Sequence, residues 1–203
     1  DAAQNNSKTC FDATSQLYDN LDGISKQSVW IVGGDGWAYD IDFGGLDHVL
    51  GSGENINILV LDTELYSNTG GQTSKASHIS STQKFATNGK QTNKKQLALM
   101  AMTYKDVYVA QVCLGADSNQ TIKAMIEAQN HNGVSLIIAY CPCINHGSKT
   151  DTLSSQINAV KSGYWHMFRF NPALKQQNKN PLVLDSAPPS QPIDMFLQDQ
   201  RRY

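Results

Sequence analysis

Short runs of apolar residues recur along the chain, separated by stretches with a different periodicity. Each run has five or six residues and shows little alternation between apolar and polar positions, which is typical of strands buried on both faces of a parallel sheet. We therefore predict four buried strands, at Ser28–Val32, Asn57–Leu61, Val107–Val112 and Ser135–Tyr140.

Amphipathic segments lie between and after these runs. They predict helices at Tyr39–Leu50, Lys94–Thr103, Ser118–Asn130 and Ser154–Lys161. Ser118 is the expected N-cap of its helix, because its hydroxyl can accept a hydrogen bond from a free backbone N–H group. The pair Lys94-Lys95 is interpreted as an exposed helix start. Alternating strands and helices indicate an α/β fold, with a parallel sheet and helices on both faces.

Three polar motifs directly follow predicted strands. They are Gly34-Asp35-Gly36, Asp62-Thr63-Glu64 and Cys141-Pro142-Cys143. The carboxyl ends of parallel strands meet at one edge of a sheet, where α/β proteins bind ligands. The polar stretch 66–93 is longer than most connections, and loops of that length are usually functional. These segments together predict a ligand site at this edge.

The ends of the chain have a different character from its middle. Residues 1–27 are rich in Asn, Gln, Asp and Ser, and we interpret them as a polar leader that belongs to a missing neighbouring region. Residues 28–172 form the predicted domain, and residues 173–203 are predicted to be an extended tail with little periodic pattern. The chain lacks an initiator Met, so we expect it to be a piece of a longer polypeptide.

Composition narrows the possible functions. Hydrophobic residues make up 40% of the 203 positions, enough for a core, and the net charge of −2 provides no basic surface for nucleic acid or an anionic membrane. No stretch approaches the roughly 20 apolar residues that span a bilayer. The four cysteines are Cys10, Cys113, Cys141 and Cys143, and without an export signal we expect reduced thiols in an intracellular compartment.

The first two polar motifs suggest a shared metal. A helix that starts near Gly36 would offer free N–H groups to a phosphate, which the nearby Asp35 carboxylate would repel unless a cation lay between them. Magnesium is the hard, oxygen-seeking ion that bridges a carboxylate and a diphosphate. Thr63 follows Asp35 after 28 residues, the length of one strand–helix–strand crossover, and would supply a second oxygen.

The residues around these motifs carry a specific resemblance. Residues 34–41 read Gly-Asp-Gly-Trp-Ala-Tyr-Asp-Ile, and residues 61–72 read Leu-Asp-Thr-Glu-Leu-Tyr-Ser-Asn-Thr-Gly-Gly-Gln. This pattern resembles the pyruvate:ferredoxin (flavodoxin or NADP) oxidoreductase family, in its C-terminal thiamine-diphosphate-binding domain. Other thiamine-diphosphate enzymes usually have Asn where this chain has Thr63. The resemblance covers roughly residues 25–203 and implies the thiamine-diphosphate-binding fold.

The resemblance implies roles for individual residues. Magnesium would be bound by the Asp35 carboxylate, the Thr63 hydroxyl and the backbone carbonyl of Leu65. The diphosphate would be lined by Gly34, Gly36 and Ser67. Asn68 would face the thiazolium ring and the 2-oxo acid, and it is the one catalytic residue expected in this chain. His78, in the long loop, is a weaker candidate for a place near the substrate entrance.

The resemblance also implies the reaction of the whole enzyme: pyruvate and coenzyme A give acetyl-CoA and CO2, and electrons pass to iron–sulfur clusters. Ferredoxin, flavodoxin or a fused reductase would accept the electrons, in a homodimer of the cytoplasm or of a mitochondrion-derived organelle. The activating Glu lies on a separate domain in this family. We interpret Glu64 as a loop residue and Glu127 as a solvated helix residue, so the chain alone is expected to be inactive.

Cys143 would be the fourth ligand of a [4Fe–4S] cluster whose other three cysteines lie upstream, beyond this chain. It is therefore expected to be an orphaned ligand here, and Cys141 a structural residue. Two alternatives stay open. A different thiamine-diphosphate-dependent 2-oxo acid enzyme, such as a decarboxylase, would be expected to have Asn at position 63 and no need for Cys143. A non-catalytic nucleotide- or phosphate-binding α/β module would explain the glycines but not Thr63 at its spacing.

Overall fold

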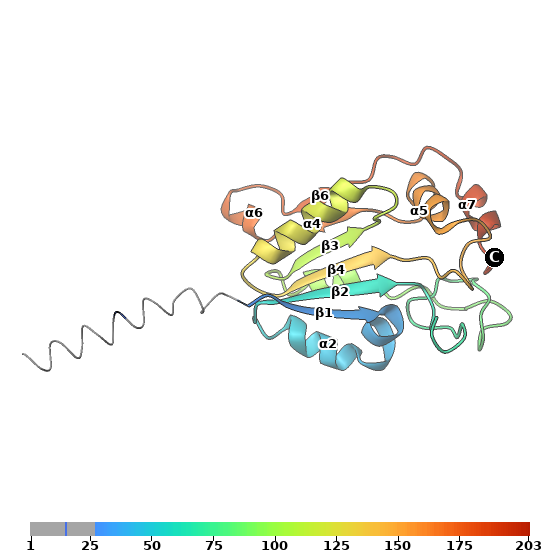
Figure 1. Ribbon diagram of the computed structural model, residues 1–203, viewed down its shortest axis with the longest axis horizontal. Helices are drawn as coiled ribbons and strands as arrows, with labels where there is room; N and C mark the ends of the chain where they lie inside the picture. Colours follow the sequence, from blue (N-terminus) through green and yellow to red (C-terminus); the bar gives the residue numbers. More distant parts are fainter. Residues whose placement is uncertain (1–14, 16–26) are drawn as a thin grey trace, which may run out of the picture.

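The structure, a computed structural model, describes residue 15 and residues 27–203, with a six-stranded sheet at its centre (Figure 1). The strand order is β1-β2-β4-β3-β5-β6. The first four strands are parallel, as predicted. The strands are β1 (Val29–Gly34), β2 (Ile56–Asp62), β3 (Tyr108–Val112), β4 (Ser135–Tyr140), β5 (Phe168–Phe170) and β6 (Leu182–Leu184). Most of the predicted leader, and Cys10 within it, lies outside the described residues.

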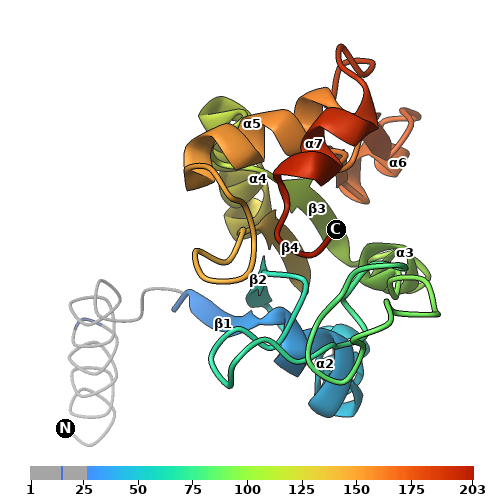
Figure 2. The same ribbon diagram turned by 90° about the vertical axis from the view of Figure 1, so that its right-hand side faces the viewer.

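The strand register brings the polar motifs to one edge. Gly34 at the end of β1 pairs with Leu61, and Asp62 at the end of β2 pairs with Tyr140 of β4. The loops that follow these strands gather at the right-hand side of Figure 1, and the C-terminus lies among them in Figure 2. The predicted ligand edge and the end of the chain therefore occupy the same side of the sheet.

The last part of the sheet differs from the prediction. β5 is antiparallel to β3, and β6 is antiparallel to β5, so the sheet is mixed rather than wholly parallel. Residues 173–203 also contain helices α6 (Ala173–Gln176) and α7 (Ile193–Asp199). The extended conformation expected there is wrong, since short elements with at most one buried side chain give little periodic signal. The domain boundary at residue 172 stays a prediction.

The remaining helices follow the predicted order. A π-helix at Gly36–Ile41 leads into α2 (Phe43–Leu50), and the others are α3 (Leu97–Met102), α4 (Ser118–Asn130) and α5 (Thr152–Lys161). The N-cap of α4 is Asp117 rather than Ser118, which corrects the prediction. Asp117 is extended, and its side chain accepts a hydrogen bond from the Gln120 N–H group, whereas Ser118 is already helical.

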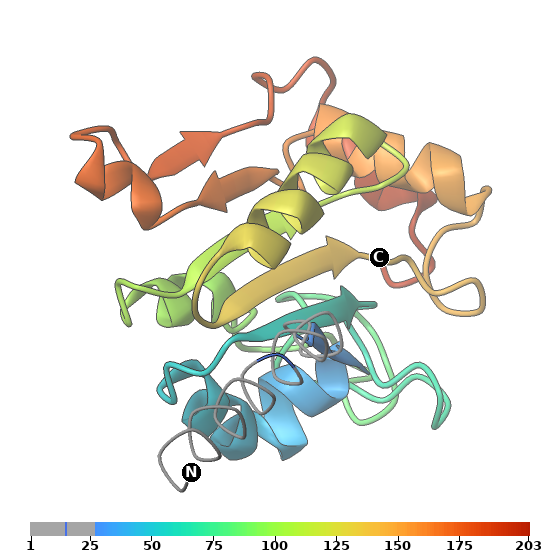
Figure 3. The same cartoon turned by 60° about the vertical axis from the view of Figure 1, so that its left-hand side comes forward.

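Helices cover both faces of the sheet, as predicted (Figure 3). On one face, α2, α3, α5 and α7 share a core with alternate strand residues such as Ile58, Val60 and Ile138. On the other face α4 packs against the intervening residues, including Ala110 and Ile137. Because successive strand residues point to opposite faces, the apolar runs fill two cores. Among the described residues, no helix is both long and apolar enough to cross a membrane.

Candidate functional site

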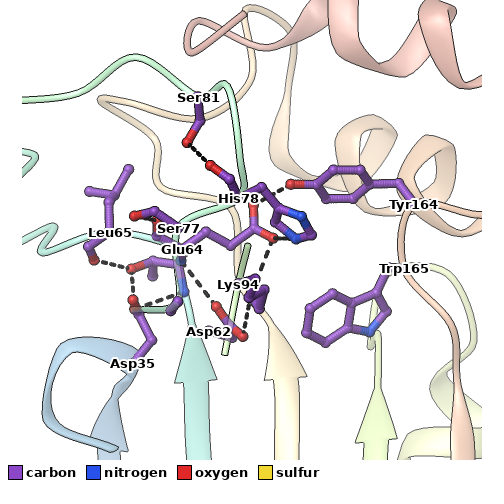
Figure 4. Close-up of polar contacts among 12 residues, drawn as sticks. Asp35, Asp62, Glu64, Leu65, Ser77, His78, Ser81, Lys94, Tyr164 and Trp165 are labelled. Atoms are coloured by element: carbon purple, nitrogen blue, oxygen red, sulfur yellow. Dashed lines mark hydrogen bonds and ion pairs between the residues drawn. The ribbon is translucent and has the colours of Figure 1, made fainter. Parts of the chain in front are cut away.

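Three oxygen atoms converge where β1 and β2 end. The Thr63 hydroxyl donates to Asp35 Oδ1 at 2.7 Å and lies 2.9 Å from the carbonyl oxygen of Leu65. The Thr63 N–H group also donates to Asp35 Oδ1, at 3.0 Å. The structure thus brings together the three residues predicted as magnesium ligands, although they come from two strand ends. In Figure 4, the dashed lines that start at the labelled Asp35 and Leu65 mark these contacts.

Asp35 is a buried carboxylate, 1% exposed, with neutral hydrogen-bond donors around it. Burial, and then the nearby Asp62 carboxylate, raise the pKa of Asp35 from 3.8 to about 7, against the lowering effect of the Thr63 hydrogen bonds and Lys94. The Ser74 hydroxyl donates to its other oxygen at 3.3 Å. A carboxylate with this raised pKa has no strong cation of its own, and a bound cation would stabilise its charged form.

The donor atoms suit a hard cation. A carboxylate, a hydroxyl and a carbonyl are all oxygen ligands, which magnesium prefers, and it usually keeps waters and phosphate oxygens in its other positions. Within residue 15 and residues 27–203, no group of three or more His, Cys, Asp or Glu side chains could hold a metal. A metal at Asp35 would therefore have one protein carboxylate, which leaves its charge available to an anionic ligand such as a diphosphate.

Gly36 is required by a close contact. A Cβ atom there would lie 2.4 Å from the ring of Tyr66, whose hydroxyl donates to the Gly36 carbonyl at 3.3 Å. Gly34 is exposed and faces open space, with nothing within 4 Å of where its Cβ would be. The helical turn starts directly after Asp35, and π-helical turns inside helices often occur at functional sites.

The predicted substrate residues lie in a tight turn. Tyr66 and Gln72 form an isolated antiparallel bridge, and Gly70 and Gly71 adopt positive φ values that let the chain reverse. Ser67 is half-buried and Asn68 is exposed, and neither side chain hydrogen-bonds to the described part of the chain. Their polar groups are therefore free for a ligand.

A group of buried charges lies beside the three oxygens (Figure 4). Asp62 and Glu64 are both 0% exposed. Lys94 Nζ lies 2.7 Å from Asp62 Oδ2 and 3.4 Å from Glu64 Oε1. Burial alone would lower the pKa of Lys94, but the two carboxylates raise it above its ordinary value. Asp62 also accepts a hydrogen bond from the Tyr39 hydroxyl, at 2.7 Å.

Glu64 has the most charged partners of any residue in this group. Arg202 Nη2 lies 2.6 Å from its Oε2 atom, and His78 Nε2 lies 3.1 Å from its Oε1 atom. The Tyr164 hydroxyl donates to Oε2 at 2.9 Å. Burial would raise the pKa of Glu64, but Lys94, Arg202 and His78 together hold it well below its usual range. Glu64 is therefore a buried anion at the centre of a charge network.

Two of the sequence-based interpretations, of Lys94 and Glu127, need correction here, and that of Glu64 needs extension. Lys94 is not an exposed helix start, because its side chain is only 9% exposed and α3 begins at Leu97. Glu64 lies in a loop but is buried and paired. Glu127 is not simply solvated, because it forms an ion pair with Arg169 at 2.5 Å. Two acids beside a buried strand need counter-charges, and that requirement was the signal that could have pointed to a buried lysine.

Cys143 lies in the loop after β4, half-buried, with its Sγ atom 3.4 Å from Nδ1 of His146. Cys141 is also half-buried, and burial and then the neighbouring Cys143 raise the pKa of its thiol. Cys113 is fully buried, which raises the pKa of its thiol to about 12. In the structure these three cysteines are free thiols.

Known proteins resemble this chain closely over most of its length. It is 55% identical over 183 residues to the pyruvate:ferredoxin oxidoreductase of Moorella thermoacetica, and 53% identical over 191 residues to the pyruvate-flavodoxin oxidoreductase of Klebsiella pneumoniae. These matches cover 90% and 93% of this chain but 16% of each relative. A mitochondrial pyruvate dehydrogenase [NADP(+)] of Euglena gracilis is 50% identical over 191 residues, 93% of this chain and 10% of that protein.

A solved structure supports the fold assignment. The 2-oxoglutarate:ferredoxin oxidoreductase of Magnetococcus marinus, with 2-oxoglutarate, coenzyme A and succinyl-CoA bound, matches with a TM-score of 0.53. The match is 21% identical and covers 82% of this chain and 60% of that one. Residues 20–139 match the family model of the thiamine pyrophosphate enzyme C-terminal TPP-binding domain. The chain therefore belongs to the family of C-terminal TPP-binding domains of thiamine pyrophosphate enzymes.

Proposed function

We propose that this chain binds the diphosphate half of magnesium–thiamine diphosphate within a pyruvate:ferredoxin-type oxidoreductase. One observation carries the proposal: the Thr63 hydroxyl oxygen lies 2.7 Å from a carboxylate oxygen of Asp35 and 2.9 Å from the carbonyl oxygen of Leu65. Relatives that carry pyruvate oxidoreductase names share half or more of their residues with this chain over the matched span. The chain spans 16% of the length of the two bacterial relatives and 10% of the Euglena protein, so the proposed reaction belongs to a larger protein.

In this proposal Asp35, Thr63 and Leu65 hold the magnesium ion. Gly34 and Gly36 line the diphosphate in this proposal. Gly34 leaves open space at the strand end where a diphosphate can approach the backbone, and Gly36 makes room for the Tyr66 ring beside it. Ser67 offers its hydroxyl as a hydrogen-bond donor to the same diphosphate. Thr63 keeps its hydroxyl aimed at Asp35 because its own N–H group is bonded to the same carboxylate oxygen.

Asn68 is the proposed catalytic residue of the chain. When bound, thiamine diphosphate would supply a nucleophilic carbon and an electron sink for the decarboxylation of a 2-oxo acid. The exposed Asn68 amide would hydrogen-bond the 2-oxo acid and orient its reacting carbonyl. No carboxylate of the site is free to activate the cofactor, because Glu64 is held as a buried anion by Lys94 and Arg202. The chain alone would therefore be inactive.

The wider assignment follows from the relatives. Pyruvate and coenzyme A are the proposed substrates, and ferredoxin, flavodoxin or a fused reductase the electron acceptor. Cys143 would ligate a [4Fe–4S] cluster only in the complete protein, a proposed homodimer of the cytoplasm or a mitochondrion-derived organelle. Cys143 is half-buried in the loop after β4, where its thiol could bind a cluster whose other cysteine ligands lie outside this chain.

The two alternatives explain less. Another thiamine-diphosphate-dependent 2-oxo acid enzyme would account for Asp35, but not for Thr63 in place of Asn or for the names of the relatives. A nucleotide-binding module would account for the glycines, but the match to the TPP-binding family model argues against it.

Calorimetry on the complete protein tests the proposal. We expect thiamine diphosphate to bind only with magnesium, and Asp35→Ala to weaken binding by about a hundredfold, because the one charged metal ligand is lost. Asp47→Ala, which removes an exposed carboxylate on α2, is the matched control and should bind normally. Loss of pyruvate-dependent electron transfer in Asp35→Ala alone would support the proposal. A preference for ATP or NAD, or equal binding by both variants, would contradict it.

A further inference from the structure

The residue between two of the proposed magnesium ligands has an unusual backbone. Glu64 has a φ of 65°, in the left-handed region that side chains other than glycine rarely adopt. This turn points the Thr63 hydroxyl and the Leu65 carbonyl at the same place, since the two atoms are 2.9 Å apart. Such a conformation costs free energy, so the surrounding structure must hold it.

Contacts hold Glu64 on every side. Its N–H group donates to Asp62 Oδ1 at 3.1 Å, and its carbonyl accepts from the Ser77 hydroxyl at 2.6 Å. Its carboxylate reaches away from the metal ligands to Arg202 and Tyr164. The backbone contacts are local or come from the long loop, whereas Arg202 lies 138 residues further along the chain.

Arg202 is buried almost completely, with 3% of its surface exposed, and its one ion pair among the described residues is with Glu64. Its Nε and Nη1 atoms are buried and have no hydrogen-bond partner in the described part of the chain. Burying a guanidinium in this way is favourable only if the Glu64 carboxylate is there to receive it. Without Arg202, Lys94 would be the one lysine or arginine paired with two buried carboxylates.

The end of the chain is fastened to the same region by other bonds. The Arg202 carbonyl accepts from the N–H group and the hydroxyl of Thr82, at 2.8 and 3.0 Å. The Arg201 N–H group donates to the Gly147 carbonyl at 2.9 Å, and Phe196 of α7 stacks on Tyr164 with ring centroids 4.4 Å apart. Residues 193–202, the C-terminal segment, therefore connect the long loop, the loop after β4 and Glu64.

We propose that Arg202 is a positioning residue for the magnesium site and acts through Glu64. When the C-terminal segment is docked, Arg202 fixes the Glu64 carboxylate and with it the left-handed turn that aligns Thr63 and Leu65. When the segment is undocked, Glu64 loses that partner and the two ligand oxygens lose their alignment. The C-terminal segment thereby controls metal affinity without touching the metal. This inference rests on the proposed function, because it concerns the same magnesium site.

The test is the magnesium concentration that half-saturates thiamine diphosphate binding to the complete protein, followed by calorimetry. Arg202→Met should raise this concentration by about tenfold or more, as loss of residues that orient metal ligands commonly does. Arg202→Lys, which keeps the charge, should recover part of the loss. Lys179→Met removes an exposed cation whose side chain is hydrogen-bonded to Gln177, outside the C-terminal segment, and is the matched control, with no expected change. A merely structural role would lower the folded fraction but leave the half-saturating concentration of the folded protein unchanged.

A second variant tests the route through Glu64. Glu64→Gln removes the charge that Arg202 pairs with. The double variant with Arg202→Met should therefore need no more magnesium for half-saturation than the single variant that binds magnesium less tightly. Additive losses, or normal magnesium dependence in a folded Arg202→Met or Arg202→Gln protein, would overturn the inference and leave the proposed function intact. If the unmodified protein bound thiamine diphosphate without magnesium, or Asp35→Ala bound it normally, the proposed function itself would fail, and the inference with it.

Discussion

Two groups of buried charges attach the C-terminal part of the chain to the sheet, and they are built differently. In the Arg169 group, the guanidinium donates to both oxygens of Asp185 at 2.8 Å and to Glu127 at 2.5 Å, so all three of its nitrogens have acceptors. In the Glu64 group, Arg202 uses one nitrogen and buries two without partners. The two groups share no residue.

The backbone differs between the two groups as well. Arg169 lies in β5 with regular antiparallel pairing to Ala110 of β3, whereas Glu64 has a left-handed backbone between two proposed metal ligands. The Arg169 group joins elements that are already regular, and its satisfied hydrogen bonds suit a purely stabilising role. The Glu64 group holds a strained turn, and unsatisfied polar atoms and strain occur together at functional sites. A buried ion pair alone therefore does not reveal its role.

The largest expected effect is that of removing Lys94. Lys94→Met would leave Asp62 and Glu64 buried with one fewer cation, so we expect a loss of about 3–5 kcal/mol in the free energy of unfolding. Urea denaturation measures it. Lys75→Met breaks an ion pair with Asp40 in which the lysine is 62% exposed, and should cost under about 1 kcal/mol. Equal losses in the two variants would show that burial of the charges does not matter.

A smaller effect is expected in the Arg169 group. Arg169→Met removes three charge-assisted hydrogen bonds, but Glu127 and Asp185 are 22% and 13% exposed and can be partly hydrated. We therefore expect a loss of about 2–3 kcal/mol in the free energy of unfolding. The half-saturating magnesium concentration should stay within about twofold of the unmodified value, because no hydrogen bond or ion pair in the described part of the chain joins this group to Asp35. A tenfold rise would remove the proposed difference between the two groups.

The sequence predicted those features of the fold and of the candidate site that depend on local residue patterns. Strands β1–β4 and the ligand edge followed from apolar runs and from the polar motifs behind them, and the structure brings Asp35, Thr63 and Leu65 together as expected. Arg202 was missed because its partner is 138 residues away, and no periodicity links such positions. Lys94 was misread because a charged residue before a helix is usually exposed, and only the buried acids opposite it reverse that expectation.

The last effect, and the one that isolates Asp35, is a pH dependence. Its pKa in the folded chain is raised to about 7 from 3.8, so between these values the folded state holds a proton that the unfolded state has lost. Stability of the metal-free protein should therefore fall as pH rises through this window. Magnesium needs the deprotonated carboxylate, so its half-saturating concentration should rise by about tenfold per pH unit below about 7.

Titrations at several pH values between about 5.5 and 8, with thiamine diphosphate present, measure this dependence. Asp35→Asn should abolish the pH dependence that Asp35 contributes to metal-free stability. His78→Gln removes the imidazole that lies 3.1 Å from Glu64 Oε1 and is the matched control for the Glu64 group. If Asp35 governs the pH dependence, His78→Gln should leave the change of the half-saturating magnesium concentration with pH unaltered. If instead the pH dependence of the half-saturating magnesium concentration vanished in His78→Gln and persisted in Asp35→Asn, the pH sensitivity would belong to the Glu64 group and not to the metal ligand Asp35. The Glu64 and Arg169 groups would then differ in protonation as well as in backbone strain.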